Sequence, residues 1–398
     1  MLFTLEALQA QGGDCLVLLY GAPRDPRVIV IDGGPTKAVF RRLRARLDAL
    51  RAALDLEADG LPLDIELLMV SHIDDDHIDG ILHLTRLLLE ERNDPPFAIV
   101  TLWHNAFDDL LGNSADELSR SAGDAVREAS AGAGAFDQSL VRPDTALVLA
   151  SVNQGRELRD NATRLGLTPP LLVARPGERR RDFGSGLTLR VVGPREEQVR
   201  ALQDTWEAEL RRLAREGRLG GTEAASFADR SAANLASLVV LAEADGRSML
   251  LTGDARGDYL VDSLREQDLL VDGRLHVDLF KLPHHGSDRN VERSTFETIT
   301  ADHYVISGDG HHGNPEVATF EMLFGGRVDA GLLDRPFTLH LTYAPQTFRA
   351  DRGAPYPLAR LLALFEDART AGHRFEVVHP VAGGEELVRV ELGESLAL

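Results

Sequence analysis

Short apolar runs alternate with longer segments of helical periodicity along the first hundred residues of the chain. Runs rich in aliphatic and β-branched residues predict strands, and they lie at 15–21, 27–34, 61–70 and 96–103. Apolar residues at helical spacing, separated by charged ones, predict amphipathic helices at 36–56 and 80–93. This alternation of strands and helices favours a layered architecture of mixed α and β structure.

The rest of the chain continues this pattern, with two additions to it. Residues 106–180 are rich in Ala, Asp and Gly and mostly helical in pattern, which predicts a helical insertion on the core. Further strands are predicted within 186–194, 236–255, 277–282 and 303–307, and a charged helix at 195–217. The tail predicts a small strand–helix–strand–strand appendage. The predicted domains are therefore 1–330, which includes the insertion, and a C-terminal extension at 331–398.

The composition is that of a soluble globular enzyme, with 43% hydrophobic and 27% charged residues among 398. No apolar run reaches the ~20 residues of a transmembrane helix, and the N-terminus lacks the basic segment of a signal peptide. The single cysteine, Cys15, excludes an internal disulfide framework and a Cys-rich zinc site. We therefore expect a cytoplasmic protein that has no membrane partner.

The formal net charge of -20 bears on the choice of partners. A surface this acidic repels nucleic acid at long range and gives little affinity through counterion release. Two basic runs do occur, "RRLRAR" at 41–46 and "GERRRD" at 177–182. We interpret them as a solvated helix face and a loop, so that free DNA as the sole substrate would need a partner to present it.

Three consecutive aspartates lie between two histidines in "SHIDDDHIDG", directly after a predicted strand. Closely packed carboxylates repel one another, and burying them costs free energy unless a cation offsets the repulsion. His72 and Asp74 can point the same way at a strand end, whereas Asp76 and His77 can face a second point at the turn into the helix. The spacing predicts two metal ions, with Asp75 not a ligand. The alternative, a helix cap, explains only one aspartate.

Several separated motifs resemble the metallo-β-lactamase superfamily, in the order of that family. "SHIDDDHIDG" is similar to its His-x-His-x-Asp-His signature, with Asp74 in place of the second histidine. "GGDCLVLLYG" and "VIVIDGG" resemble its opening hairpin, with Asp14 and Asp32 at the usual acidic positions. The resemblance covers most of residues 10–325 and implies an αββα sandwich: two mixed sheets face to face, helices outside, and the site at one edge.

The late motifs supply the remaining ligands that this resemblance implies. "SMLLTGDA" resembles the strand that delivers a bridging carboxylate, here Asp254, and "LFKLPHHGS" resembles the late histidine motif, which places His284 or His285 on the second metal. The expected metal ligands are His72, Asp74, Asp76, His77, Asp254, His284 and His285.

Within the superfamily the chain looks most similar to the hydrolase domain of competence-type DNA-uptake proteins. That branch has the same Ser-His-x-Asp-x-Asp-His form and the "HHGS" loop. It replaces the middle "GHTPG" histidine of the family by an Asn/Ser segment, here "SAANLASLVVL" with Asn234 and Ser237. The departure argues against lactamase, glyoxalase II and lactonase activity and leaves the third ligand of the first metal open.

The ligand types indicate the reaction. Asp74 adds a hard oxygen donor, which shifts the preference from zinc towards manganese, so the expected cofactors are two divalent ions, Zn²⁺ or Mn²⁺. Two cations bridged by Asp254 would lower the pKa of a shared water and stabilise charge on a phosphoryl oxygen. The expected function is therefore phosphodiester hydrolysis, on a nucleotide or nucleic-acid substrate. Cys15 lies in a predicted buried strand, which argues against a covalent role.

Other polar residues are candidates for catalysis and substrate binding. We expect Asp76, His312 and Asn234 to take part in catalysis, with His312 donating a proton to the leaving oxygen or gripping a phosphate. His104, Ser237 and His311 are candidate substrate-binding residues. His104 is equally compatible with core packing, and Asn234 and Ser237 with capping a turn.

Two other functions remain open. The first is hydrolysis of a different ester, such as a phosphocholine-type or thioester substrate. The second is a metal-bearing subunit of a larger bacterial assembly, for example in defence. In that case the insertion or the C-terminal extension would be the surface for a protein partner or for a second copy of the chain.

Overall fold

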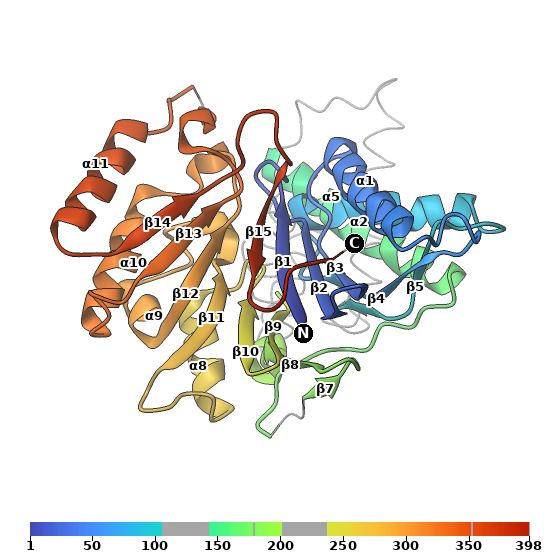
Figure 1. Ribbon diagram of the computed structural model, residues 1–398, viewed down its shortest axis with the longest axis horizontal. Helices are drawn as coiled ribbons and strands as arrows, with labels where there is room; N and C mark the ends of the chain where they lie inside the picture. Colours follow the sequence, from blue (N-terminus) through green and yellow to red (C-terminus); the bar gives the residue numbers. More distant parts are fainter. Residues whose placement is uncertain (106–142, 178–179, 201–236, 352, 398) are drawn as a thin grey trace, which may run out of the picture.

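The fold consists of two β-sheets and the helices that cover them (Figure 1). The computed structural model describes residues 1–105, 143–177, 180–200, 237–351 and 353–397. The first sheet has the strand order β15-β1-β2-β3-β4-β5, and β6 also pairs with β4. Its strands are β1 (Leu2–Leu8), β2 (Leu16–Ala22), β3 (Asp25–Ile31), β4 (Leu63–Val70), β5 (Phe97–Ile99), β6 (Leu102–His104) and β15 (Leu387–Glu391).

The second sheet has the strand order β14-β13-β12-β11-β10-β9-β8-β7. The strands from β10 to β14 run parallel, whereas β7 to β10 pair antiparallel. The strands are β7 (Arg181–Asp182), β8 (Leu187–Gly193), β9 (Val239–Ala244), β10 (Arg247–Leu251), β11 (Leu275–Lys281), β12 (Ile299–Ile306), β13 (Phe337–Leu341) and β14 (Phe375–Val378).

The inner faces of the two sheets share one hydrophobic core. Leu5 and Met69 of the first sheet belong to the same buried cluster as Leu189 and Leu279 of the second. Because side chains alternate across a strand, the other residues of these strands point outward and need cover. The packing therefore forms four layers: helix, sheet, sheet and helix.

Helices fill the two outer layers. On the first sheet these are α1 (Lys37–Ala53), α2 (Asp75–Glu90) and α5 (Pro143–Arg164). On the second sheet they are α8 (Gly257–Glu266), α9 (Arg293–Thr298), α10 (Val317–Asp329) and α11 (Leu358–Thr370). None of the helices in these described ranges is long and apolar enough to cross a membrane.

The mixed α/β class predicted from the sequence is confirmed. The helix predicted at 36–56 is α1, and the helix predicted at 80–93 is α2, which begins five residues earlier than predicted, at Asp75. In the predicted insertion, α5 packs on α2 through Leu158 and Ala162, whereas residues 106–142 lie outside the described ranges. Most of the helix predicted at 195–217 lies outside them too.

The segment 331–398, predicted as a small extension, supplies strands to both sheets. β13 pairs parallel with β12, and β15 pairs antiparallel with β1 at the other end of the chain. Leu339 and Leu341 point into the core that the second sheet shares with α10 and α11. Val388 and Val390 of β15 lie in the core between the two sheets. The segment is therefore part of the sandwich, because its apolar residues fill both of these cores.

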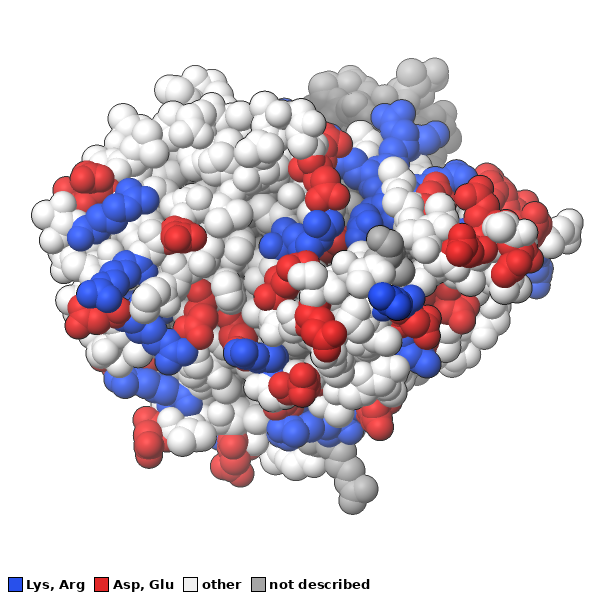
Figure 2. Space-filling model, viewed as in Figure 1, with Lys and Arg blue, Asp and Glu red and all other residues white. Residues whose placement is uncertain are grey.

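A buried carboxylate ties three elements of the first sheet together. Glu6 of β1 is fully buried and accepts hydrogen bonds from Arg46 of α1 (Nε–Oε2 2.6 Å) and Arg389 of β15 (Nε–Oε1 2.9 Å). A buried charge needs such partners to offset its desolvation. Arg42 of the same helix pairs with Glu386. Basic and acidic side chains consequently interleave over α1 and β15 (Figure 2).

We predict that the C-terminal segment contributes strongly to stability. Leu339→Ala leaves a cavity in the core under β13 and should lower the free energy of unfolding by about 2–5 kcal/mol. The matched control is Val378→Ala in β14, whose side chain is 38% exposed, with an expected loss of about 0.5 kcal/mol or less. Guanidinium unfolding of both variants measures the difference, and equal losses would contradict the packing.

Candidate metal centre

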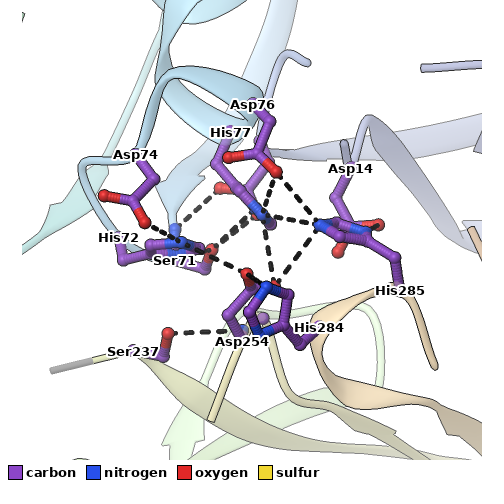
Figure 3. A network of polar contacts seen from close by, with 12 residues as sticks. Asp14, Ser71, His72, Asp74, Asp76, His77, Ser237, Asp254, His284 and His285 are labelled. Atoms are coloured by element: carbon purple, nitrogen blue, oxygen red, sulfur yellow. Dashed lines mark hydrogen bonds and ion pairs between the residues drawn. The ribbon is translucent and has the colours of Figure 1, made fainter. Parts of the chain in front are cut away.

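The candidate site lies at one edge of the sandwich, where strands of both sheets end (Figure 3). From the first sheet, β4 runs into the segment from Ser71 to His77. From the second, β10 is followed by Asp254 and β11 by His284 and His285. Loops beyond the carboxyl ends of neighbouring parallel strands converge in this way in α/β folds.

One oxygen of Asp254 faces a first set of donor atoms. Asp254 Oδ2 lies 3.6 Å from His72 Nε2 and 3.5 Å from His284 Nε2. His72 Nε2 also lies 3.6 Å from Asp74 Oδ2. We call these atoms the first donor group: an oxygen each of Asp74 and Asp254 and the Nε2 atoms of His72 and His284.

The other oxygen of Asp254 faces a second set. Asp254 Oδ1 lies 3.3 Å from His77 Nε2 and 3.6 Å from His285 Nε2. Asp76 Oδ2 lies 3.2 Å from His285 Nε2 and 3.8 Å from His77 Nε2. The second donor group consists of an oxygen each of Asp76 and Asp254 and the Nε2 atoms of His77 and His285. The two groups share the Asp254 carboxylate, which lies between the other members of both (Figure 3).

The Nδ1 atom of every histidine in the two groups contacts an oxygen outside them. His72 Nδ1 lies 3.0 Å from Ser71 Oγ, and His77 Nδ1 lies 2.8 Å from Asp32 Oδ2. His284 Nδ1 lies 2.8 Å from Asn290 Oδ1, and His285 Nδ1 lies 3.0 Å from Ser307 Oγ.

These partners assign the tautomers of the rings. Ser71 Oγ donates its hydrogen to Asp32, and Ser307 Oγ donates its own to Asp14, so both hydroxyls accept from the histidines. The amide oxygen of Asn290 is an acceptor only. A neutral imidazole that donates from Nδ1 carries its lone pair on Nε2. A neutral ring in this tautomer would present its Nε2 lone pair to Asp254. His77 Nε2 and His285 Nε2 lie 3.3 Å apart, so one of these two nitrogens carries a hydrogen unless a cation lies between them.

Two atoms at the centre are buried without a hydrogen-bond partner among the described residues: His72 Nε2 and Asp254 Oδ1. Buried polar atoms are normally paired, so such an exception points to a missing ligand. Imidazole nitrogens and carboxylate oxygens with partners behind them are the usual ligands of Zn²⁺ and similar ions. Two sets of side chains here have donor atoms close enough together to hold a metal ion: Asp14, His77, Asp254 and His285, and His72, Asp76 and His77.

The electrostatics of the centre favour positive charge. Burial disfavours charge on His285, but Asp254 and Asp14 outweigh it and raise its pKa to about 9. Burial likewise opposes charge on His77, yet Asp254 and Asp76 raise its pKa well above the ordinary value. Burial would raise the pKa of Asp76, but His77 and His285 lower it to about 2. Protons or cations must therefore neutralise the carboxylates.

Left-handed backbone brings two consecutive histidines to the same carboxylate. His284 has φ 48° and His285 has φ 54°, and Gly286 follows with φ 82°. L residues other than Gly rarely adopt such angles, and their occurrence together marks functional sites. Because of this turn both histidines reach the centre: His284 faces one oxygen of Asp254, and His285 faces the other.

The start of α2 does not support the capping alternative. Asp74 is the residue that precedes the helix, and its side chain makes no capping hydrogen bond among the described residues. Asp75 and Asp76 lie inside the first turn of α2 and not at the capping position before it, and Asp75 accepts a hydrogen bond from Gln154 of α5. Asp74 and Asp76, by contrast, both lie beside histidines of the centre.

The other predicted site residues lie in different places. Ser237 is buried, and its Oγ accepts from the backbone N–H of Asp254 at 3.3 Å, so it contacts the backbone beside the centre. Asn234 lies outside the described residues. His104 is buried at the end of β6, with no hydrogen-bond partner for either ring nitrogen among the described residues.

His311 and His312 lie on the surface, in the turn that follows β12. Their rings are 3.9 Å apart, and together with Asp351 they form a further cluster of donor atoms that could hold a metal. The turn borders the centre through one glycine loop: His311 lies against Gly12, and Gly13 lies against the Asp76 carbonyl.

Several residues at the centre had no signal in the sequence. Asn290 and Ser307 are ordinary polar residues of loops, and only the folded turns bring them to His284 and His285. Lys281 lies within the late histidine motif, and its buried ammonium donates to Asp14 Oδ2 at 2.9 Å. A lysine at the end of a predicted strand, three residues before the first histidine of the motif, is the sequence signal for this contact.

No protein-family model matches this sequence, and neither does any curated protein.

The environment of His104 gives a prediction about pH. Burial lowers its pKa to about 4, so below about pH 6.5 the unfolded chain binds a proton that the folded protein does not bind until about pH 4. Stability is thus present above pH 6.5 and lost as the pH falls. Between pH 7 and pH 5 this loss is about 2 kcal/mol. The measurement is the free energy of unfolding of wild type and of His104→Leu at pH 7 and pH 5, with chelator present. Wild type should lose about 2 kcal/mol more than the variant, and equal losses in the two proteins would contradict the low pKa of His104.

Proposed function

We propose that this chain is a dinuclear metal-dependent hydrolase of the metallo-β-lactamase superfamily that cleaves phosphodiesters. The observation that carries the proposal is the position of Asp254. Oδ2 of Asp254 belongs to the first donor group, and Oδ1 belongs to the second. A carboxylate that bridges two metal ions would have this arrangement. A single structural ion would need only one of the two groups.

The four layers and the edge position of the centre support the family assignment. The resemblance implies both features. The four layers follow from the core that the two sheets share, and the position of the centre follows from the strand ends that converge on Asp254. The aspartates after β1 and β3, Asp14 and Asp32, also lie at the centre, behind His285 and His77.

The donor types support two divalent ions, Zn²⁺ or Mn²⁺. Each donor group offers two imidazole nitrogens and two carboxylate oxygens. Imidazole suits zinc, and carboxylate oxygens add affinity for manganese. Bound cations would supply Lewis-acid activation of water and charge stabilisation at a phosphoryl oxygen.

The chain itself orients the substrate and handles protons. Asp74, Asp76 and His284 are partly exposed, with side chains 30%, 34% and 30% accessible, so the open side of the centre lies next to them. His312 and His311 border that side through the Gly12–Gly13 loop. We assign His312 to protonate the leaving oxygen or to bind a phosphate, with His311 beside it. Cys15 is buried, and burial raises the pKa of its thiol, which disfavours a thiolate nucleophile.

The proposal predicts metal-dependent turnover of a generic chromogenic phosphodiester, bis(p-nitrophenyl) phosphate, with Mn²⁺ or Zn²⁺ supplied. Asp254→Asn removes the shared carboxylate and should lower kcat/KM by roughly a hundredfold or more, and Asp76→Ala should do the same. Cys15→Ala, outside the centre, should keep the wild-type rate.

Circular dichroism checks that each variant is folded. If the Asp254→Asn variant hydrolysed the substrate at the wild-type rate, that result would contradict the role of the shared carboxylate. Absence of turnover from folded, metal-loaded wild type would contradict phosphodiester hydrolysis and favour a different ester or a partner-dependent subunit.

A further inference from the structure

We infer that the two donor groups bind their cations with unequal affinity and in a fixed order, the second donor group first. The inference rests on the proposed function, since it presupposes that both groups bind metal. It comes from the residues behind the histidines, which differ between the two groups.

A carboxylate contacts one histidine of the second donor group directly. Asp32 is buried, and its Oδ2 accepts from His77 Nδ1 at 2.8 Å. The backbone N–H of Ser71 donates to Asp32 Oδ1 at 2.7 Å and fixes the carboxylate. A carboxylate behind a ligating imidazole raises its basicity and holds its ring, and losing it typically costs 10–100-fold in metal affinity.

A second buried carboxylate stands behind the other histidine of that group. Asp14 Oδ1 lies 3.4 Å from His285 Nδ1, and Ser307 Oγ bridges the two, at 3.0 Å from the ring nitrogen. Lys281 Nζ holds Asp14 in place from its other oxygen. The backbone N–H of Asp14 also donates to the Asp76 carbonyl at 3.2 Å, so one residue fixes two members of the second donor group.

Neutral groups contact the histidines of the first donor group. His284 Nδ1 meets the amide oxygen of Asn290, and His72 Nδ1 meets the hydroxyl of Ser71, which donates to Asp32 as Ser307 donates to Asp14. Among the described residues neither Nδ1 contacts a carboxylate directly, whereas His285 Nδ1 lies 3.4 Å from Asp14. The two groups also differ in exposure: the His284 side chain is 30% accessible, whereas that of His285 is 2% accessible.

These differences act in the same direction. The second donor group has the more basic, better fixed and more buried histidines, so it takes the first cation. That cation then repels the next one across the shared Asp254 carboxylate, which weakens the first donor group further. We expect the two dissociation constants to differ by at least about tenfold.

The test is a calorimetric titration of chelator-stripped protein with Co²⁺, with the visible absorption spectrum recorded at each addition. His312→Ala serves as the background, because the surface cluster of His311, His312 and Asp351 would add a further weak equivalent. The expected result is two equivalents with Kd values at least about tenfold apart. His284→Ala should remove the weak equivalent and His285→Ala the tight one.

Exchanging the residue behind a histidine provides the sharper comparison. Asn290→Asp puts a carboxylate behind His284 and should tighten the weak equivalent by about tenfold, while the tight one stays unchanged. Asp32→Asn is its counterpart and should weaken the tight equivalent by 10–100-fold. Circular dichroism checks that both variants are folded. If Asp32→Asn does not fold, the effect of Asn290→Asp on the weak equivalent alone tests the order of binding.

Each outcome separates this inference from the proposed function. Two equivalents with the same Kd, or an Asn290→Asp variant that alters only the tight one, would overturn the order of binding and leave a dinuclear centre intact. Loss of the tight equivalent in His284→Ala would also overturn it. A single equivalent in the parent protein would overturn both the order and the dinuclear proposal.

Discussion

The structure of the site depends on one buried negative charge that four imidazoles share. Asp254 is buried, and although burial alone would raise its pKa, the surrounding histidines, His284 and His77 foremost, lower it well below the ordinary value. An isolated carboxylate at that depth would be neutral. Its charge is maintained only because Nε2 atoms surround it, and this requires protons or cations between the groups. The same constraint explains the positions of Asp74 and Asp76 beside the histidines.

Holding that many charged groups together requires both sheets. His72 follows β4 and His77 lies in the first turn of α2, whereas Asp254, His284 and His285 follow β10 and β11. Asp14, after β1, joins the halves: it pairs with Lys281 of the second sheet and donates its backbone N–H to Asp76 of the first. The centre is therefore a product of how the sheets pack, and the shared hydrophobic core between them fixes its geometry.

Periodicity predicted α1, α2 and many of the strands, because amphipathic patterns report burial directly. It missed β1, whose residues are all buried, and the helices α8, α9 and α10. The spacing of "SHIDDDHIDG" predicted two facing donor sets, since side chains alternate near a strand end. Pairing between distant segments was not predictable in this way. β15 lies beside β1, and Asn290 lies behind His284, through turns that leave no periodic pattern in the sequence. The choice between His284 and His285 likewise needed the left-handed angles of that turn, which residue types alone do not reveal.

Under the proposed function, those angles also explain how the chain manages without the middle histidine motif of the family. Consecutive residues of an extended chain point to opposite sides, so two adjacent histidines could not serve one carboxylate. In the left-handed turn before Gly286 they approach Asp254 from different sides, and His284 takes the open place in the first donor group. That replacement comes from a short turn that is partly exposed and backed by an amide. A ligand gained in this way is held less firmly than one anchored at the end of a buried strand.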